Sequence, residues 1–364
     1  MSIFPFIRLF PSDLNIDFLG LRRFTMVISM VLIAAAVSLV ATRGLNYGID
    51  FQGGVEVAVR YQQPADIEAV RQSIADLNAG DAAVQQFGEV TDVLVRVEAP
   101  AAATAKEQSD AALALRKDIQ SALVALQPGA VLGDSASTTD NDNVVELLSD
   151  NFVGSAISGE LFQAGMIAIA LALTGVAIYI WFRFEWQFAI SALAALLHDV
   201  LTTIGLFALL QIEFNLYTTA AILTIAGYSI NDTVVVFDRS REELRRYKET
   251  PIVDVLNKAI NGTLTRTIMT SITTLLAVVA LAVFGGPIIR GLAVALIWGV
   301  VIGTYSSIFF ATPLLTLFNL RNDVFEKKDA ANDEDFAAAW AATQKDDDEE
   351  EIRRKVRERE GQGE

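Results

Sequence analysis

The sequence predicts a polytopic α-helical membrane protein with six transmembrane helices and one small α+β domain outside the bilayer. Of the 364 residues, 52% are apolar, and the mean hydropathy of +0.40 is high for a water-soluble chain. Six segments are apolar enough to cross a bilayer, which takes about 20 apolar residues each. Residues 44–158 contain no such segment, so they are expected to fold in water as a separate domain.

The expected transmembrane helices correspond to these apolar segments. They cover residues 24–42, 161–182, 188–210, 214–237, 267–284 and 291–317. Arg22 and Arg23 precede the first helix, and no small-residue cleavage site of the A-x-A type precedes Gly44. We therefore expect an uncleaved anchor with a cytoplasmic N-terminus, because basic residues favour the cytoplasmic side. Six crossings return the C-terminus to that side.

The connecting segments agree with this orientation. Residues 239–266 are rich in Lys and Arg and are expected to be a cytoplasmic loop with one or two short helices along the inner membrane face. The turn 211–213 has no basic residue and is expected outside. The turn that contains Arg290 is also expected outside, and this arginine is an exception to the rule that basic residues lie on the cytoplasmic side. Residues 1–23 are expected to form a cytoplasmic lead. The acidic residues 321–364 are expected to form a solvated, disordered tail, with a partner-binding helix as the alternative.

The external domain expected at residues 43–160 alternates strand and helix patterns. Alternating apolar residues and 3.6-residue periodicity predict the order β-α-β-β-α-β, which is typical of a ferredoxin-like sheet. In that order the segments are 55–61, 64–78, 82–87, 93–98, 105–126 and part of 129–157. The preceding GIDFQGG lacks the spacing of a phosphate loop. A tight turn entering a strand, close to another backbone element, is the favoured interpretation.

Composition excludes several functional classes. The absence of Cys excludes disulfides, thiolate catalysis and Cys-based metal sites, and the single His cannot build a His-rich metal site. The net charge is −16 and no basic stripe suggests nucleic acid. The external domain contains no nucleophile–base pair. We therefore expect no cofactor and no covalent catalysis.

Two polar residues, Asn231 and Asp232, lie inside the fourth apolar segment. A charged side chain at the bilayer centre costs roughly 2.5–3.5 kcal/mol on insertion scales. The helical neighbours of Asp232 are half polar, which favours a position facing a bundle interior or a wet cleft. Asp232 is thus a candidate functional group, with a buried polar contact that only fixes helix packing as the alternative.

Three of the expected helices carry polar stripes at helical spacing. The stripes are His198, Asp199, Thr202 and Thr203 in the third helix, Ser229, Asp232 and Thr233 in the fourth, and Arg266, Thr270, Thr273 and Thr274 in the fifth. Three such stripes are expected to converge on one interior. Arg266 opens its helix from the inner side, so it could approach Asp232.

An acid and a movable guanidinium can couple proton binding to helix movement. A carboxyl group binds a proton more readily when a nearby positive charge moves away, and releases it when the charge returns. One charge crossing 100 mV is worth about 2.3 kcal/mol, so a few protons can drive a large conformational step. A static ion pair between Asp232 and Arg266 is the alternative. For His198, a packing hydrogen bond and a proton relay are equally open.

Several long motifs resemble those of SecF, a family of subunits of the bacterial preprotein translocase within the RND superfamily of proton-driven transporters. They are GYSINDTVVVFDR at 227–239, INGTLTRTIMTSITTLLAVVALAVFGG at 260–286, LNYGIDFQGG at 45–54, ALLHDV at 195–200 and NIDFLGLRR at 15–23. The resemblance covers nearly the whole chain to about Arg321. Two parts depart from the family pattern, namely the Ala- and Asp-rich middle of the external domain and NFVGSAISGEL, which lacks a Pro after Gly154.

The resemblance implies a role that residue spacing alone does not. SecF-like proteins pair with SecD, whose six spans complete a twelve-helix RND arrangement, and work beside the SecYEG channel and its small associated membrane proteins. They use the proton-motive force, without ATP, to promote late steps in the export of unfolded polypeptides. The expected location is the bacterial inner membrane, with residues 43–160 in the periplasm. Asp232 would match the family's proton-carrying Asp and Arg266 its partner, with Asn231, Thr233, Asp199 and His198 in support.

Two other functions stay open from the sequence. A structural scaffold would use the polar stripes only to fix helix packing, and Asp232→Asn separates this function from proton coupling. A small-molecule exporter of the RND type would need large external domains and twelve spans in one chain. Transport of a dye by the chain purified without SecD would favour that exporter.

Overall fold

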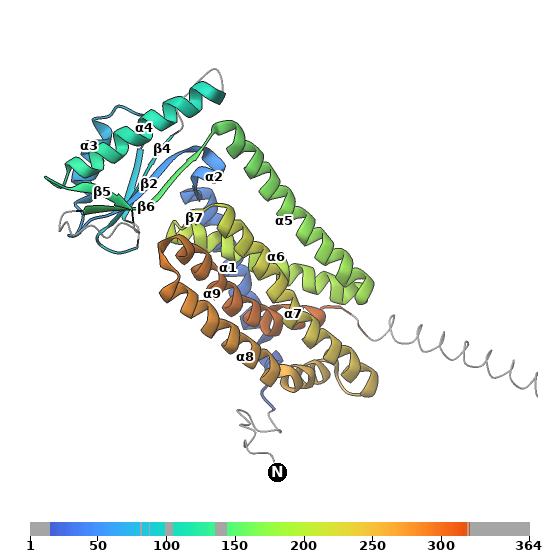
Figure 1. The fold of residues 1–364 in the computed structure, drawn as a ribbon. Coiled ribbons are helices and arrows are strands. Elements are labelled where there is room, and N and C mark those ends of the chain that lie inside the picture. The colour runs from blue at the N-terminus through green and yellow to red at the C-terminus, as the bar shows by residue number, and fades with distance from the viewer. Residues whose placement is uncertain are drawn as a thin grey trace, which may run out of the picture.

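The computed structural model describes residues 15–320, apart from 81, 87, 99–104, 135–143 and 319. Within this range the chain forms a bundle of six long helices with an α+β domain at one end (Figure 1). The bundle helices are α1 (Arg22–Arg43), α5 (Ser155–Arg183), α6 (Trp186–Leu210), α7 (Leu216–Arg246), α8 (Ile252–Phe284) and α9 (Gly286–Ser306). All six are long and apolar enough to cross a membrane, which confirms the predicted number. The tail at 321–364 and most of the lead at 1–23 lie outside the described residues.

The helices extend well beyond the predicted spans at the end of the bundle away from the α+β domain, here called the far end. The expectation of a loop with separate short helices at 239–266 was wrong, because α7 runs on to Arg246 and α8 already begins at Ile252. Arg239 pairs with Glu242 and Glu243 at helical spacing, and such pairs support a helix in water. The amphipathic residues therefore extend the two membrane helices.

The sixth membrane helix is irregular near its end. After α9, residues Ser307–Ala311 form a π-helical turn, labelled η2, and α10 (Thr312–Leu315) completes the segment. Thr312 Oγ1 donates to the carbonyl of Ser307 at 2.9 Å, which satisfies an acceptor in the wider turn. Such π-bulges are frequent at functional sites.

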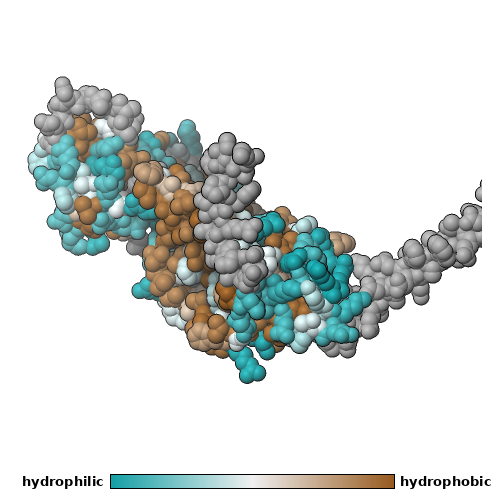
Figure 2. All heavy atoms as spheres, turned by 90° about the horizontal axis from the view of Figure 1, so that it is seen from below, coloured by the Kyte–Doolittle hydropathy of each residue, from teal (hydrophilic) through white to brown (hydrophobic). Residues whose placement is uncertain are grey.

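Three helices form the interior of the bundle. About half of the residues are buried in the membrane-spanning parts of α6, α7 and α9, against fewer than a fifth in α1, α5 and α8. A Cβ at Gly299 would lie 2.3 Å from the Ile225 side chain, so glycine allows α9 to approach α7 closely. Figure 2 shows the apolar surface gathered on the bundle, whereas the α+β domain is mostly hydrophilic.

The α+β domain is a five-stranded sheet with the order β3-β4-β2-β6-β5. Its strands are β2 (Gly54–Arg60), β3 (Ala82–Gln86), β4 (Asp92–Val97), β5 (Val131–Asp134) and β6 (Val144–Val153), and its helices are α3 (Ile67–Ala75) and α4 (Ala105–Ala125). The predicted ferredoxin-like pattern is present, but with an added strand. β6 takes the place beside β2 that a single last strand would occupy, and β5 pairs with it in parallel at the edge.

One face of this sheet carries the domain core. Valines at alternate positions of β2 and β4, including Val57 and Val95, pack against Ile74 of α3 and Ile119 of α4. The valines recur with the period of two of a strand, although β4 is buried on both of its faces. The helix predicted at 64–78 begins three residues later than expected, because the Asp66 side chain accepts hydrogen bonds from two amides of the first turn.

Candidate functional site

Asp199 lies where the three interior helices meet. Its carboxyl is fully buried, and Oδ1 lies 2.8 Å from Nδ1 of His198. Oδ2 accepts hydrogen bonds from Ser229 Oγ on α7 and from Ser306 Oγ on α9, the latter at 2.7 Å. One carboxyl therefore joins α6, α7 and α9.

His198 is held by aromatic rings from the irregular end of the sixth span. Its imidazole stacks on Phe310 at a centroid distance of 5.0 Å and lies 6.3 Å from the Tyr305 ring. Nε2 is buried and has no hydrogen-bond partner among the described residues. The π-helical turn brings Phe310 to this position, while Ser306 next to the turn contacts Asp199.

Asp232 occupies a second polar site, one turn along α7 from Ser229. Its side chain is buried, but Oδ2 has no partner among the residues that the structure describes. Arg266 of α8 acts on this carboxyl electrostatically, and Thr270 faces it. No direct ion pair between Arg266 and Asp232 is present in the described part of the chain. The guanidinium therefore acts on the carboxyl through its charge, without a direct contact.

The polar stripes converge only in part. Asp199, His198, Asp232 and Thr233 are buried, and the Thr233 hydroxyl donates to the Ser229 carbonyl at 3.2 Å. Arg266, Asn231 and Thr273 are exposed on the outside of the bundle, whereas Thr270 faces Asp232, so the expected convergence of the α8 stripe holds for Thr270 and not for Arg266 and Thr273. α8 lies at the edge of the bundle, where a stripe contacts the interior with one side only.

Sequence reasoning missed the contribution of the sixth span. Ser306 completes the Asp199 cluster, and Ser307 and Thr312 next to it are also fully buried. A signal was present in the sequence, since residues 303–307 read GTYSS inside an otherwise apolar helix. Polar residues in such a helix usually face protein rather than lipid.

The GIDFQGG segment forms the joint between bundle and α+β domain. β1 (Asn46–Tyr47) pairs in parallel with β7 (Glu213–Phe214) in the turn between α6 and α7. The short helix α2 (Ile49–Gln52) follows. Gly53 then has a φ of +76°, and a Cβ at this position would lie 3.2 Å from the backbone of Ser155 at the start of α5. This matches the predicted tight turn with close backbone contact, and the positive φ explains why glycine is needed.

A buried arginine fastens this joint. Arg96 of β4 donates to Glu56 at 2.9 Å and to Glu213 of the α6–α7 turn. Burial raises the pKa of the Glu213 carboxyl, although the charge of Arg96 opposes this. The α+β domain and the interior helices are thus connected through one ion-paired cluster.

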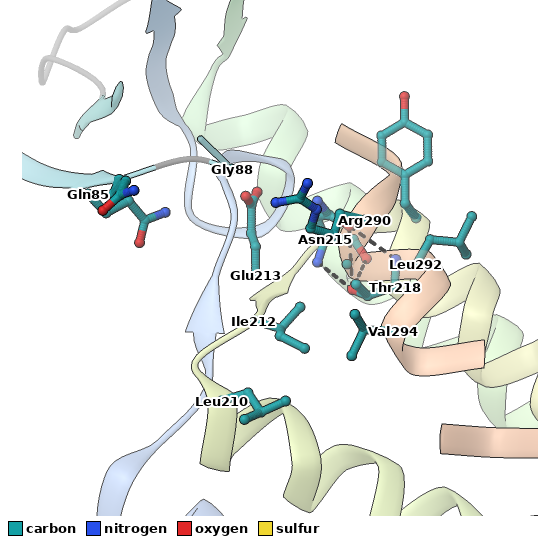
Figure 3. Close-up of a pocket in the computed structure, with 13 residues that line it drawn as sticks. Gln85, Gly88, Leu210, Ile212, Glu213, Asn215, Thr218, Arg290, Leu292 and Val294 are labelled. Carbon is teal, nitrogen blue, oxygen red and sulfur yellow. Dashed lines mark hydrogen bonds between the residues drawn. The ribbon is translucent and has the colours of Figure 1, made fainter. Parts of the chain in front are cut away.

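A cavity of about 300 Å³ lies beside the joint, with walls from both parts of the molecule (Figure 3). Gln85 and Gly88 come from the α+β domain, while Glu213 and Arg290 face it from the bundle side. Arg290, an exception to the basic-residue rule, therefore lies near acidic Glu213.

Comparison with known proteins assigns the chain to a family. Residues 134–321 match the model "Protein export membrane protein SecD/SecF, C-terminal", and residues 38–65 match the "SecD/SecF GG Motif". Protein translocase subunit SecF of Cereibacter sphaeroides is 42% identical over 331 residues, which cover 91% of this chain and 98% of the relative. The chain belongs to the SecF family. The joint described above coincides with the family's GG motif.

Further SecF relatives and solved structures agree. Protein translocase subunit SecF of Magnetococcus marinus is 43% identical over 312 residues, covering 86% of this chain and 94% of that protein. The crystal structure of SecDF, a translocon-associated membrane protein from Thermus thermophilus, matches 85% of this chain at 32% identity with a TM-score of 0.71. The match spans 39% of the SecDF chain. SecDF in a super-membrane-facing form matches with a TM-score of 0.55 at 28% identity.

Proposed function

We propose that this chain is the SecF subunit of a bacterial preprotein translocase that couples proton flow to movement of its external domain. The observation that carries the proposal is Asp232, a buried carboxyl with one oxygen unpartnered among the described residues and with the Arg266 guanidinium nearby but not ion-paired to it there. A carboxyl held in this way can change its charge without breaking an ion pair. The protons act as coupling ion, without ATP, cofactor or covalent chemistry.

Movement at Asp232 can reach the external domain through α7. This helix carries Ser229 and Asp232 and begins at Leu216, next to the β1–β7 joint. Asp50 of the GG segment accepts a hydrogen bond from the Leu216 amide at 3.0 Å. A shift of α7 caused by protonation would therefore be transmitted to the segment that enters β2 of the external domain.

The polar surface around Arg266 fits a SecD partner. Arg266, Asn231 and Thr273 are exposed on α7 and α8, and an exposed arginine within a membrane helix is poorly tolerated against lipid. A second six-helix subunit covering this face would supply the missing contacts and complete a twelve-helix bundle. Asp232 and Arg266 would then lie at the interface of the two subunits. In this arrangement both termini are cytoplasmic, the α+β domain is periplasmic, and SecYEG and the exported polypeptide are the further partners.

Asp232→Asn in the chain expressed together with SecD tests the proposal. Proton-driven stimulation of export in membrane vesicles is expected to be lost, while copurification with SecD is kept, because Asn preserves the shape but cannot change charge. Asp238→Asn is the matched control, since Asp238 lies on the same helix in an exposed pair with Arg183. Normal stimulation by the Asp232→Asn protein would reject proton coupling at this site and leave the scaffold function.

A structural role is favoured for Asp199. Both of its oxygens are engaged by His198, Ser229 and Ser306, so this carboxyl holds three helices together. The two acids thus divide the scaffold and coupling functions between them. Nothing among the relatives above favours the small-molecule exporter, since those compared are SecF proteins.

A further inference from the structure

A groove between α5 and α6 opens on the outer side of the bundle, where α5 lies at the edge (Figure 1). Ile178, Trp181 and Phe182 of α5 and Leu197 of α6 line it, and these side chains are 44–85% exposed. The volume of the groove is about 450 Å³. Its lining on α5 runs from Leu173 to Phe182, which is about 14 Å at 1.5 Å per residue. This length is about half the thickness of a bilayer core, the depth that the acyl chains of one leaflet occupy.

Basic side chains surround a second cavity, of about 520 Å³, at the far end of the bundle. This cavity adjoins the groove, because Arg183 directly follows Phe182 and is the last residue of α5. Two acids among four arginines leave a formal surplus of two positive charges in its lining. The lining, here called the basic cluster, consists of Arg183, Asp238, Arg241, Glu242, Arg245 and Arg246.

Two arginines of the basic cluster are held in place by the α5–α6 turn. The guanidinium carbons of Arg183 and Arg241 lie 4.9 and 5.6 Å from the ring centroid of the buried Phe184. Asp238 pairs with Arg183 at 2.7 Å, and Glu185 pairs with Arg241 at the same distance. A guanidinium that is already fixed loses little conformational freedom on binding, and its planar fork matches the oxygens of a phosphate group.

An exposed tryptophan gives the level of this site in the membrane. Trp181 is 62% exposed, and tryptophan is enriched at the level of lipid headgroups. The basic cluster then lies among the phosphates, while the groove lies among the acyl chains. An amphiphile with a negative head matches both parts, whereas free phosphate would contact the cluster alone. The orientation in the proposed function puts this end at the cytoplasmic leaflet, whose anionic lipids attract basic segments.

We propose that the groove and the basic cluster together bind one anionic phospholipid. Its phosphate contacts Arg183 and the neighbouring arginines, and one acyl chain lies between α5 and α6. A zwitterionic phospholipid with the same chains binds more weakly, because its own cation is repelled by the surplus positive charge. The site does not require a proton at Asp232, so it is independent of proton coupling.

Photolabelling of the chain in complex with SecD tests this site. The complex is placed in nanodiscs of phosphatidylcholine that contain a trace of phosphatidylglycerol with a photoreactive group in its acyl chain. Labelled peptides are quantified by mass spectrometry, and phosphatidylcholine with the same reactive chain is the comparison probe. The phosphatidylglycerol probe is expected to label residues 173–197 at least about tenfold more, equivalent to roughly 1.4 kcal/mol. Both probes should label the opposite end of α5 equally, where Met166 and Ile167 are exposed.

Three outcomes of the photolabelling would overturn the proposal. Equal labelling of residues 173–197 by the two probes would make the groove an ordinary lipid-facing surface. Absence of label there from both probes would mean that a protein helix covers the groove. Loss of the preference in excess inorganic phosphate, but not in sodium chloride of the same ionic strength, would assign a free-phosphate site instead. None of these measurements depends on export, so failure of this site is distinguishable from failure of the proposed function.

Arg183→Gln combined with Arg246→Gln tests the charge of the basic cluster. This pair is expected to lower phosphatidylglycerol labelling to the phosphatidylcholine level. Arg183→Lys combined with Arg246→Lys should keep most of the labelling, which separates loss of charge from misfolding. Arg23→Gln combined with Lys258→Gln is the matched control, since both side chains are exposed at the same end of the bundle, on α1 and α8. An equal loss in the control pair would show attraction to any positive charge at this end and would overturn the site.

Discussion

Buried acids are treated in opposite ways in the two parts of this molecule. In the α+β domain, Asp92 accepts two hydrogen bonds from Arg60, at 2.7 and 2.8 Å, and Glu213 at the joint is paired with Arg96. In the bundle, Asp199 contacts hydroxyls and an imidazole, and Asp232 has Thr270 and Arg266 nearby, the latter without an ion pair among the described residues. The contrast teaches that the α+β domain pairs its acids with arginines, whereas the bundle holds Asp199 by uncharged hydroxyls and leaves one oxygen of Asp232 without a partner among the described residues.

The largest loss of stability is expected at Asp199. Its comparison with Asp232 tests whether the two acids of the bundle have different roles. Asp199→Ala removes the acceptor of Ser229 and Ser306 and leaves several buried donors unpaired, which should cost about 3–5 kcal/mol of stability. Thermal unfolding of the detergent-solubilised complex measures this loss. Asp232→Asn should change the same unfolding free energy by less than about 1 kcal/mol. Equal destabilisation by the two variants would remove the distinction between a holding acid and a switching acid.

Arg96→Ala tests whether the joint depends on its fixed charge. Loss of the contacts to Glu56 and Glu213 should cost about 2–3 kcal/mol, seen as faster amide hydrogen exchange in β1 and β7. Since Arg96 opposes the effect of burial on Glu213, its removal should raise the pKa of Glu213 further. A raised carboxyl pKa favours the buried state at low pH, so the variant joint should loosen as pH rises through that value.

Arg71→Ala is the control for the joint, because Arg71 forms an exposed pair with Glu68 on the surface of α3. An exposed pair contributes little to stability, so exchange in β1 and β7 should stay unchanged. Unaltered exchange in the Arg96→Ala protein as well would mean that strand pairing alone holds the joint.

The pH dependence of the α+β domain's stability should follow Asp92. Burial alone would raise the pKa of Asp92, but hydrogen bonds from Arg60 and Thr91 hold it below its usual value. Stability from this carboxylate is therefore complete above its unfolded pKa of about 3.9 and is lost as pH falls through the folded value. Asp92→Asn should cost about 1–2 kcal/mol at neutral pH and flatten the acid limb of an unfolding curve measured in the full chain. An unchanged acid limb would assign acid sensitivity to other groups.

Tyr61→Phe should give the smallest loss of stability, because it removes a hydrogen bond between two uncharged groups. The Tyr61 hydroxyl donates to the Leu123 carbonyl at 2.9 Å, and burial raises its pKa to about 12. Loss of this one neutral hydrogen bond should cost about 1 kcal/mol, measured by denaturant unfolding, with no change in the acid limb. A cost as large as that of Asp92→Asn would show that neutral and charged contacts stabilise the domain equally.

Much of the fold could be predicted because its elements have strong periods. Six apolar segments gave the six helices, and alternate valines gave β2 and β4. The ends of α7 and α8 were mistaken for a loop, since hydropathy detects where a helix leaves the membrane and not where it stops. The added strand β5 was missed because it is only four residues long, Val131–Asp134, too short to show an alternating pattern.

The candidate site was predictable where polarity contradicts an apolar surrounding. Asp199, His198 and Asp232 were found in this way, and all are buried. Ser306 was missed, although GTYSS at 303–307 is unusually polar for a membrane helix, because its role depends on the π-helical turn beside it. The outward position of Arg266 could not be predicted either, since a polar stripe does not reveal which neighbour it meets.

Because α7 is one uninterrupted helix, a small rotation at Asp232 becomes a larger displacement at the helix start near the joint. Sixteen residues separate Asp232 from Leu216, a distance of about 24 Å along a stiff rod. A pivot of about 5° at the acid would displace the rod's other tip by about 2 Å, enough to break or make hydrogen bonds there. One uninterrupted helix thus links the Asp232 site to the β1–β7 pair at the base of the α+β domain.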